Sequence, residues 1–318
     1  MTTNFSIPVT VINVEQLTPI IKGFTFERND GEPFTPFSAG SHIVVSMDDE
    51  QRSYKNPYSL VRNSPDFKQY QIAVRREANG RGGSAYMHDE VEVGSQLEVG
   101  NPFNLFPVHW LAHKHLFIAG GVGITPFMAF IRDMKMTNSP FELHYAVRNA
   151  KHGPFVAELV ENNLKEVFIY DRGEDQVLDF KQLLSKQPLG THVYVCGPHR
   201  MVEDVLRIAE SRGWPQSAIH SEEFKAPDAG QPFSVKLARS QRDVHVSERE
   251  SLLEALERTG VEVPYSCRGG ACGFCKTDVV SGEPEHRDYY LSDEEKAANN
   301  CIMPCISRAI NDDLVLDL

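Results

Sequence analysis

The arrangement of apolar and polar positions changes twice along the chain and divides it into three parts. Up to about residue 106, short runs of alternating apolar and polar residues are separated by turn signals, and this spacing predicts a small antiparallel barrel at residues 1–108. The predicted strands are Ile7–Val14, Ile21–Phe26, His42–Ser46, Tyr70–Val74 and Gln96–Val99.

From Lys114 onward, apolar strands alternate with helical stretches. This pattern is typical of a parallel α/β domain, which we place at residues 112–226. Its predicted strands are His115–Ala119, Phe141–Val147, Val167–Tyr170 and His192–Cys196. Between Glu223 and Phe233 the chain is polar and contains two prolines and a glycine, so we interpret it as an interdomain linker.

The last part, residues 232–318, combines two strand-like runs with a helix at Leu252–Thr259, a cysteine-rich loop and a closing strand at Leu314–Leu316. A chain of 318 residues is longer than one hydrophobic core usually organises. We therefore expect a multidomain protein with an antiparallel β-barrel, a parallel α/β domain and a C-terminal α+β domain.

Composition and charge restrict the possible partners. The hydrophobic fraction of 41% and charged fraction of 24% are ordinary for a globular protein. A net charge of -12 argues against nucleic acid and anionic membrane surfaces as partners, because both attract basic proteins. The chain shows no signal sequence and no run of 18 apolar residues, so we expect a cytoplasmic protein. Its six cysteines are then better suited to metal or redox roles than to disulfides.

Four of these cysteines follow a recognisable spacing. Cys267, Cys272, Cys275 and Cys305 form the pattern C-x4-C-x2-C-x29-C, which matches the plant-type [2Fe-2S] arrangement. The small residues of the loop allow the backbone to approach the cluster and donate N–H groups to sulfur. A zinc site is the alternative, but structural zinc usually takes two short cysteine pairs. Cys301 is a second candidate for the fourth ligand. We favour Cys305 because residues 305–308 resemble the closing segment of ferredoxins, and we interpret Cys301 as a free thiol.

A glycine-rich turn follows the first strand of the predicted α/β domain. The turn reads Gly120-Gly121-Val122-Gly123-Ile124-Thr125-Pro126 and precedes a helical stretch at Phe127–Met134. Such a turn binds pyrophosphate through backbone N–H groups and the helix N-terminus. Cys196-Gly197-Pro198 ends a later strand of the same domain, where ligands of open α/β sheets bind. Two tight turns without a ligand are the simpler alternative.

The barrel region carries a second pair of motifs, Tyr58-Ser59-Leu60 and Gly80-Arg81-Gly82-Gly83-Ser84. Amides at the start of a predicted helix, the Ser84 hydroxyl and the Arg81 guanidinium could bind a phosphate. Tyr58 could stack on a flat ring. Taken alone, these motifs are those of a flexible turn and a buried strand tyrosine, and only their order along the chain favours a ligand.

The order of these four motifs resembles the phthalate dioxygenase reductase family over essentially the whole chain. This resemblance implies a reductase component of a Rieske-type oxygenase, with an FMN-binding barrel, an NADH-binding domain and a β-grasp ferredoxin domain. FAD and NADPH are the alternative cofactors. A cytochrome or another monooxygenase is the alternative acceptor, and a redox-sensing iron–sulfur protein is the alternative from another functional class.

Carried over by position, the resemblance also implies the cofactor-binding residues. They are Tyr58, Ser59, Leu60, Ile72, Ala73, Val74, Gly82, Gly83, Ser84, Gly120, Gly121, Gly123, Thr125, Pro126, Cys196, Gly197, Pro198 and Phe224. Thr125, Cys196 and Phe224 are expected beside the reacting rings. Many relatives carry arginine where this chain has Asn56, so we assign the flavin phosphate to Arg81. Arg148 is the candidate for contact with a 2′-phosphate.

The resemblance implies that NADH passes a hydride to the flavin, which gives single electrons to the cluster. A Rieske centre needs two cysteines and two histidines. Only Cys196 and Cys301 remain after the cluster ligands are assigned, and the chain has no Cys-x-His pair. We therefore expect the terminal oxygenase to be a separate protein.

Overall fold

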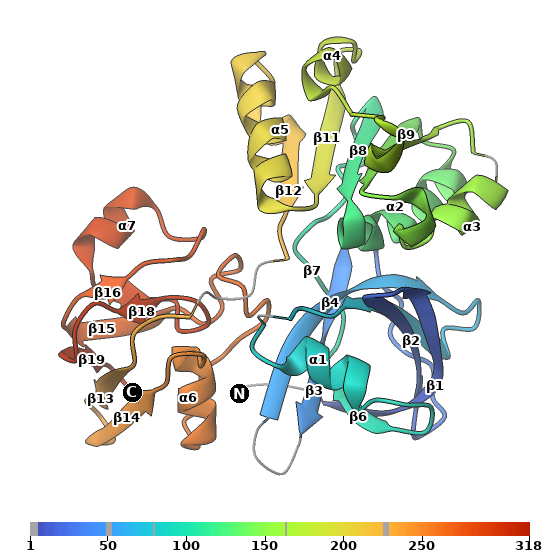
Figure 1. Cartoon of the computed structure of the whole chain (residues 1–318). Coiled ribbons are helices and arrows are strands. Elements are labelled where there is room, and N and C mark those ends of the chain that lie inside the picture. The colour runs from blue at the N-terminus through green and yellow to red at the C-terminus, as the bar shows by residue number, and fades with distance from the viewer. Residues whose placement is uncertain (1–5, 49–52, 79, 163, 225–228) are drawn as a thin grey trace. The chain divides into compact units, whose positions relative to one another are not determined.

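The computed structural model describes residues 6–48, 53–78, 80–162, 164–224 and 229–318, which fall into two compact units (Figure 1). The larger unit holds the described residues up to 224 except Gly80 and Arg81, and the smaller unit holds these two with 229–318. The predicted linker includes residues 225–228, which lie outside the described residues. The barrel and the parallel sheet belong to one unit, so the boundaries of three separate domains stay a prediction.

The first half of the larger unit is a closed antiparallel barrel. Its strands follow the order β4-β5-β2-β1-β6-β3, and β3 pairs back to β4. The elements are β1 (Ile7–Thr18), β2 (Ile21–Arg28), β3 (Ser41–Asp48), β4 (Ser53–Asn63), β5 (Gln69–Arg75), α1 (Gly83–Asp89), β6 (Gln96–Val99) and β7 (Phe103–Asn104). The five predicted strands are confirmed. The pattern did not predict β4, because its first half is polar and contains Pro57. This strand forms through its pairing with β3 and β5.

The second half of this unit is a parallel sheet in the order β10-β9-β8-β11-β12. Its elements are β8 (Lys114–Gly120), α2 (Thr125–Thr137), β9 (Phe141–Val147), α3 (Val156–Glu161), β10 (Val167–Asp171), α4 (Phe180–Ser185), β11 (Thr191–Cys196), α5 (His199–Ser211) and β12 (Ile219–Glu222). The four predicted strands are confirmed. The chain order reverses between the neighbours β8 and β11. Ligands of open α/β sheets bind outside the carboxyl ends of strands at such a reversal.

Alternate residues of β8 belong to two hydrophobic clusters on opposite faces of the sheet. Leu116 and Ile118 cluster with buried residues of α5, whereas Phe117 and Ala119 share a core with α2 and the barrel. Polar contacts join α2 to the barrel as well. Arg132 Nη1 donates to Asn63 Oδ1 at 2.6 Å. The barrel and the sheet are therefore packed against each other through α2.

The smaller unit combines a mixed sheet with two short helices. Its main sheet has the order β14-β13-β19-β15-β17, in which β13 and β19 are parallel. The elements are β13 (Phe233–Leu237), β14 (Arg242–Val246), α6 (Leu252–Arg258), β15 (Thr277–Ser281), β16 (Pro284–Glu285), α7 (Asp293–Ala298), β17 (Cys301–Ile302), β18 (Arg308–Ala309) and β19 (Leu314–Leu316). The predicted helix and closing strand are confirmed, as is the multidomain fold class. In the part of the chain that the structure describes, every helix is too short or too polar to cross a bilayer.

Candidate functional site

The two turns predicted to bind a dinucleotide meet where β8 and β11 end. A Cβ atom on Gly123 would lie 2.3 Å from the carbonyl oxygen of Cys196, so only glycine permits this approach. Gly120 also lies close to this segment, because a Cβ there would lie 2.7 Å from Pro198 Cδ. The structure therefore brings the glycine turn and the Cys196-Gly197-Pro198 turn into direct backbone contact, at the reversal point of the sheet.

Side chains from neighbouring elements hold the glycine turn in place. The Thr125 hydroxyl donates to the Val122 carbonyl at 3.0 Å, and Pro126 occupies the first turn of α2, where its missing N–H costs nothing. Tyr145 of β9 lies within hydrogen-bond distance of the Gly121 and Pro154 carbonyls, at 3.0 and 3.1 Å. Thr125 is buried, so its side chain supports the turn.

Cys196 is fully buried at the end of β11, and burial, with the nearby Glu222 and Glu223, raises its pKa. The group is therefore a neutral thiol at neutral pH. Glu222 is its register partner on β12, and burial raises the pKa of that carboxyl from 4.5 to about 8. Among the described residues, Glu222 Oε2 has no hydrogen-bond partner.

The sequence reasoning missed Glu222 and selected the neighbouring Phe224, whose side chain is 48% exposed after β12 ends. An acidic residue at the last position of a parallel strand was the available signal, because strand ends line the ligand crevice. The burial of its Oε2 atom could not be predicted from the sequence, since it depends on the pairing of β12 with β11.

Two oppositely charged residues lie at the carboxyl ends of the neighbouring strands β9 and β10. Arg148 follows β9 and is exposed. Asp171 ends β10, where its carboxylate accepts N–H groups from Ala150 and Gly173, each at 2.8 Å. These two bonds fix an acidic group at the sheet edge near Arg148. Asp171 is another residue that the sequence reasoning did not select.

The barrel motifs also come together. A Cβ on Gly83 would lie 2.5 Å from Asn56 Nδ2, so the start of α1 packs closely on β4. Asn56 Nδ2 also lies 3.1 Å from the Tyr58 hydroxyl, and burial raises the pKa of that tyrosine. Asn56 thus occupies the place between the tyrosine and the glycine turn.

Other predicted flavin residues are part of the barrel core. Leu60 and Ile72 are register partners on β4 and β5 and are completely buried, as is Val74. Ser59 and Ala73 are also buried. The side chains of Leu60, Ile72 and Val74 therefore support the wall of the barrel.

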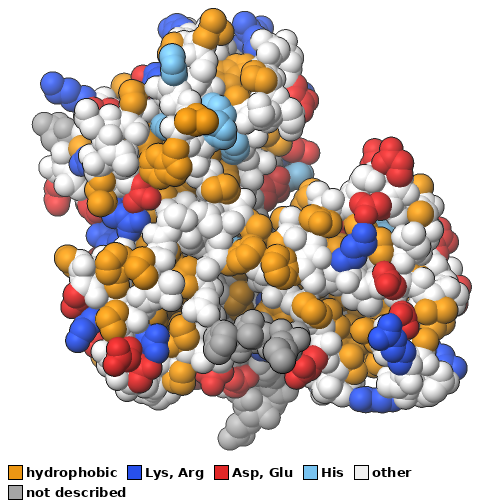
Figure 2. All heavy atoms as spheres, turned by 180° about the vertical axis from the view of Figure 1, so that it is seen from behind, with side chains coloured by type: hydrophobic (Ala, Val, Ile, Leu, Met, Phe, Trp, Pro, Cys, Tyr) orange, Lys and Arg blue, Asp and Glu red, His pale blue; other side chains and the backbone are white. Residues whose placement is uncertain are grey.

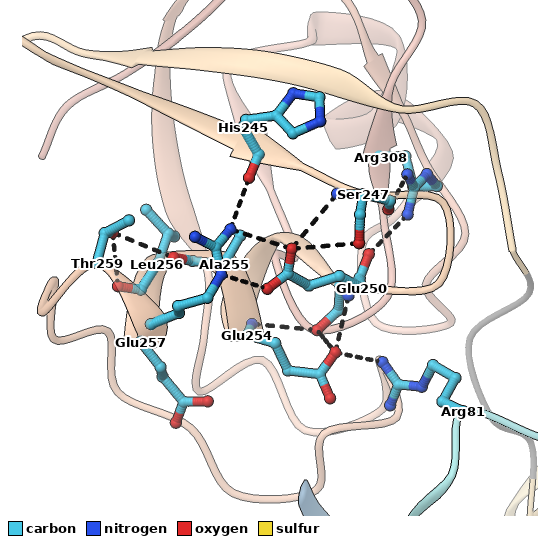
Figure 3. Close-up of polar contacts among 12 residues, drawn as sticks. Arg81, His245, Ser247, Glu250, Glu254, Ala255, Leu256, Glu257, Thr259 and Arg308 are labelled. Carbon is cyan, nitrogen blue, oxygen red and sulfur yellow. Dashed lines mark hydrogen bonds and ion pairs between the residues drawn. The ribbon is translucent and has the colours of Figure 1, made fainter. Parts of the chain in front are cut away.

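Two polar residues of the glycine segment have partners within the protein. The Ser84 hydroxyl accepts the Glu77 N–H at 3.2 Å. Arg81 groups with the smaller unit, in which its Nη1 lies 2.7 Å from Glu254 Oε2 (Figure 3). A role for Arg81 toward a phosphate stays a prediction.

The predicted cluster ligands lie in two pairs. Cys267 and Cys272 are close enough to shift each other's pKa, and so are Cys275 and Cys305. Cys267, Cys275 and Cys305 are buried, whereas Cys272 is partly exposed. Within the described ranges, no three His, Cys, Asp or Glu side chains converge as a single-ion site requires. Two cysteine pairs match the ligand set of a two-iron cluster.

Hydrogen bonds already favour a thiolate at the first ligand. The Cys272 thiol is the main cause that lowers the pKa of Cys267, burial opposes this shift, and the pKa of Cys272 is raised in return. The N–H groups of Gly269 and Ala271 also lower the pKa of Cys267, each 3.4 Å from the Cys267 sulfur. Cys301 is buried on β17, where burial raises its pKa. The loop is thus arranged to stabilise negative charge on sulfur, and it fits an iron–sulfur cluster.

Two families match parts of this chain. Residues 235–309 match the family described as the 2Fe-2S iron-sulfur cluster binding domain. Residues 102–219 match the N-terminal domain described as dimethylamine monooxygenase subunit DmmA-like. The first match covers the four cysteines, and the second covers the glycine turn and the Cys196 turn.

Close relatives match the chain along almost its entire length. It is 42% identical over 313 residues to the carnitine monooxygenase reductase subunit of Acinetobacter baumannii, with 98% of each chain covered. It is 43% identical over 310 residues to the heme-dependent oxidative N-demethylase beta subunit of Ectopseudomonas mendocina, again with 98% of each covered. A solved phthalate dioxygenase reductase, described as a modular structure for electron transfer from pyridine nucleotides to [2Fe-2S], superposes with a TM-score of 0.87. That match has 34% identity and covers 99% of this chain and 98% of the other.

Proposed function

This chain belongs to the phthalate dioxygenase reductase family, and from that premise we propose that it carries electrons from NADH through FMN and a [2Fe-2S] cluster to a separate terminal oxygenase. It is an electron-transfer oxidoreductase of the oxygenase-reductase type, as the sequence predicted. The observation that carries the proposal is the contact of the glycine turn with the Cys196 turn, in the same chain as two cysteine pairs.

The nicotinamide cofactor is assigned to the reversal point between β8 and β11. Gly120, Gly121 and Gly123 offer backbone N–H groups to its pyrophosphate, as in other α/β dinucleotide sites. Cys196, Gly197 and Pro198 flank the nicotinamide ring. The Cys196 thiol is buried and neutral, so it is not a nucleophile. It contributes to the shape of the site and can form a weak hydrogen bond.

The flavin is assigned to the face of β4 beside the start of α1. Tyr58 lines its ring, Asn56 lies between this tyrosine and Gly83, and Gly82, Gly83 and Ser84 face its phosphate. When bound, the flavin would accept two electrons from the donor and release them one at a time. The protein aligns the reactants and keeps water from between them.

We assign the cluster to Cys267, Cys272, Cys275 and Cys305. Cys267 and Cys272 would hold one iron, and Cys275 and Cys305 the other, as the two pairs suggest. Cys272 is partly exposed, so this ligand would leave a bound cluster accessible to an electron donor or acceptor.

NADH is favoured over NADPH by the charge at the sheet edge. The Asp171 carboxylate is fixed by two N–H groups where β10 ends, and a carboxylate at such a strand end favours a ribose 2′-hydroxyl over a 2′-phosphate. Arg148 is the opposing charge, but it is exposed, and an exposed charge is screened by solvent. Initial rates with the two nucleotides test this preference.

A Rieske-type oxygenase is the proposed acceptor, in keeping with the family. A heme-containing demethylase is the second candidate, since a 43% identical relative is a subunit of a heme-dependent oxidative N-demethylase. We expect the protein and its oxygenase to lie in the cytoplasm, because its cysteines are either assigned to the cluster or unpaired, and such cysteines are typical of a reducing compartment.

The experiment is anaerobic mixing of the purified holoprotein with NADH, while flavin and cluster absorbance are followed in time. Bleaching of both chromophores, followed by reduction of cytochrome c as an artificial acceptor, is the expected result. Chromatography of the released flavin distinguishes FMN from FAD. A protein purified without flavin, or a cluster that NADH leaves oxidised over minutes, would contradict the proposal and favour a sensing role.

A further inference from the structure

Arg268, the residue after Cys267, has a buried guanidinium. Its side chain is 3% exposed and forms a two-pronged ion pair with Glu257, with Nη1–Oε1 at 3.0 Å and Nη2–Oε2 at 2.8 Å. The guanidinium carbon also lies 4.5 Å from the centre of the Tyr265 ring. The planar arginine fork fits a carboxylate in one orientation, so this pair fixes direction as well as distance.

The partner Glu257 lies on a helix that is itself well anchored. Ser251 and Glu254 form a capping box at the start of α6, and Leu252, Leu253 and Leu256 are buried in the core of the smaller unit. In Figure 3 the Glu257 side chain points away from Glu250 and from the polar contacts that Glu250 makes. Arg268 is therefore tied to a rigid element that belongs to a different part of the chain.

The backbone of Arg268 adopts a left-handed conformation with φ at 51°. Residues other than glycine and asparagine rarely adopt it, and the surrounding structure must hold them there. The turn that results directs the N–H groups of Gly269 and Ala271 toward the sulfur of Cys267, at 3.4 Å each. The two amides that face a proposed ligand are thus one and three residues after the anchored arginine.

We propose that the Arg268–Glu257 pair is a positioning device that holds these two amides on the Cys267 sulfur and thereby raises the reduction potential of the cluster. The inference rests on the proposed cluster ligation. Reduction adds negative charge to the cluster and its sulfurs, and N–H donors stabilise the more negative form. Loss of the pair relaxes the turn, weakens the N–H···S contacts and makes the cluster harder to reduce.

The test uses two variants that keep the local net charge, so that a shift in potential reports geometry. Arg268→Lys keeps both charges but loses the planar fork. The double variant Arg268→Gln with Glu257→Gln removes both charges together. The matched control is Glu250→Gln with Arg258→Gln, which removes an ion pair of 2.9 Å from the same helical segment without touching the loop.

Redox titration of each holoprotein, monitored by electron paramagnetic resonance of the reduced cluster, is the measurement. Both loop variants are expected to show about tenfold less reduced cluster at a fixed potential, or about 59 mV for a one-electron couple. The control is expected to titrate like the wild type. Folded loop variants that no longer take up the cluster would also support the role, with folding checked by circular dichroism.

Wild-type potentials and spectra in both loop variants would overturn the inference. So would unfolding of both variants while the control stays folded, because that outcome shows a role in stability alone. Failure of the proposed function looks different, since the wild type itself would then lack the cluster or fail to reduce it with NADH.

Discussion

Cys196 and Glu222 are register partners where the parallel strands β11 and β12 end, and one oxygen of the Glu222 carboxyl has no hydrogen-bond partner among the described residues. Burial raises the pKa of this carboxyl from 4.5 to about 8. Two uncharged acids, a thiol and a carboxyl, therefore lie together at the proposed nicotinamide site at neutral pH.

The first prediction concerns stability and Glu222. Between pH 4.5 and 8 the folded protein keeps a proton that the unfolded chain has lost, so stability falls as pH rises through this window. Glu222→Gln mimics the protonated acid and removes this loss. The difference in Tm between this variant and the wild type is expected to increase by several degrees from pH 5 to pH 8. Each kcal/mol of stability corresponds to about 2–4 °C in Tm. Glu210→Gln is the control, because that residue lies exposed on α5. An equal pH trend in both variants would refute the assignment.

The second prediction concerns histidines of the parallel-sheet half, where Figure 2 shows histidine side chains beside hydrophobic ones. His192 Nδ1 lies 2.9 Å from His220 Nε2, and the His220 ring stacks on Tyr194 at 4.4 Å. Burial and the neighbouring histidines lower the pKa of His220 from 6.5 to about 4. The unfolded chain therefore binds more protons between pH 6.5 and 4, and this contribution to stability is lost as pH falls.

His220→Gln is expected to reduce the fall in Tm between pH 7 and pH 5 by about 2–4 °C for each kcal/mol involved. Differential scanning calorimetry measures it. His152→Gln, at an exposed histidine, serves as the control. The prediction fails if the two variants show the same dependence on pH.

The third prediction separates the proposed fourth ligand from its neighbour. Cys305→Ser is expected to abolish the cluster absorbance and the reduction of cytochrome c to background, while NADH still reduces the flavin. Cys301→Ser is expected to keep the cluster, because that residue is a buried thiol on β17. Iron content and visible spectra of the purified variants decide between them. If the cluster survives in Cys305→Ser and disappears in Cys301→Ser, Cys301 is the fourth ligand and Cys305 is the free thiol.

The fourth prediction tests the contact between the two turns. A Cβ on Gly123 would lie 2.3 Å from the Cys196 carbonyl oxygen, so Gly123→Ala must displace the nicotinamide site. We expect a loss of stability of about 1–3 kcal/mol from overpacking. The kcat/KM for NADH is expected to fall about 100-fold, because small displacements have large effects on aligned reactants.

Gly213→Ala is the matched control for that variant. Gly213 has φ at 75° and open space around it, so alanine there strains the backbone without a clash. It is expected to lower Tm and leave the NADH kinetics unchanged. Equal loss of kcat/KM in both variants would show that the Gly123 effect is only one of stability.

Short sequence patterns were enough to identify the motifs that bind cofactors. The loop with Cys267, Cys272 and Cys275, the glycine turn after an apolar strand and the Cys196-Gly197-Pro198 segment are each short, so they can be identified without knowledge of distant residues. Strands with regular apolar alternation, such as β1 and β2, were predicted for the same reason. The polar half of β4 shows no such alternation, so its place in the barrel was not predictable from its own residues.

The sequence by itself therefore determined the family, the order of the motifs and the chemistry that the cysteines can perform. Only the tertiary structure decided which groups face one another: Glu222 beside Cys196, Arg268 on Glu257 and Asn56 against Gly83. These contacts depend on strand register and on packing between segments far apart in the chain. Local periodicity encodes the elements, but the burial that shifts a pKa or holds a left-handed residue in place arises only when those elements assemble.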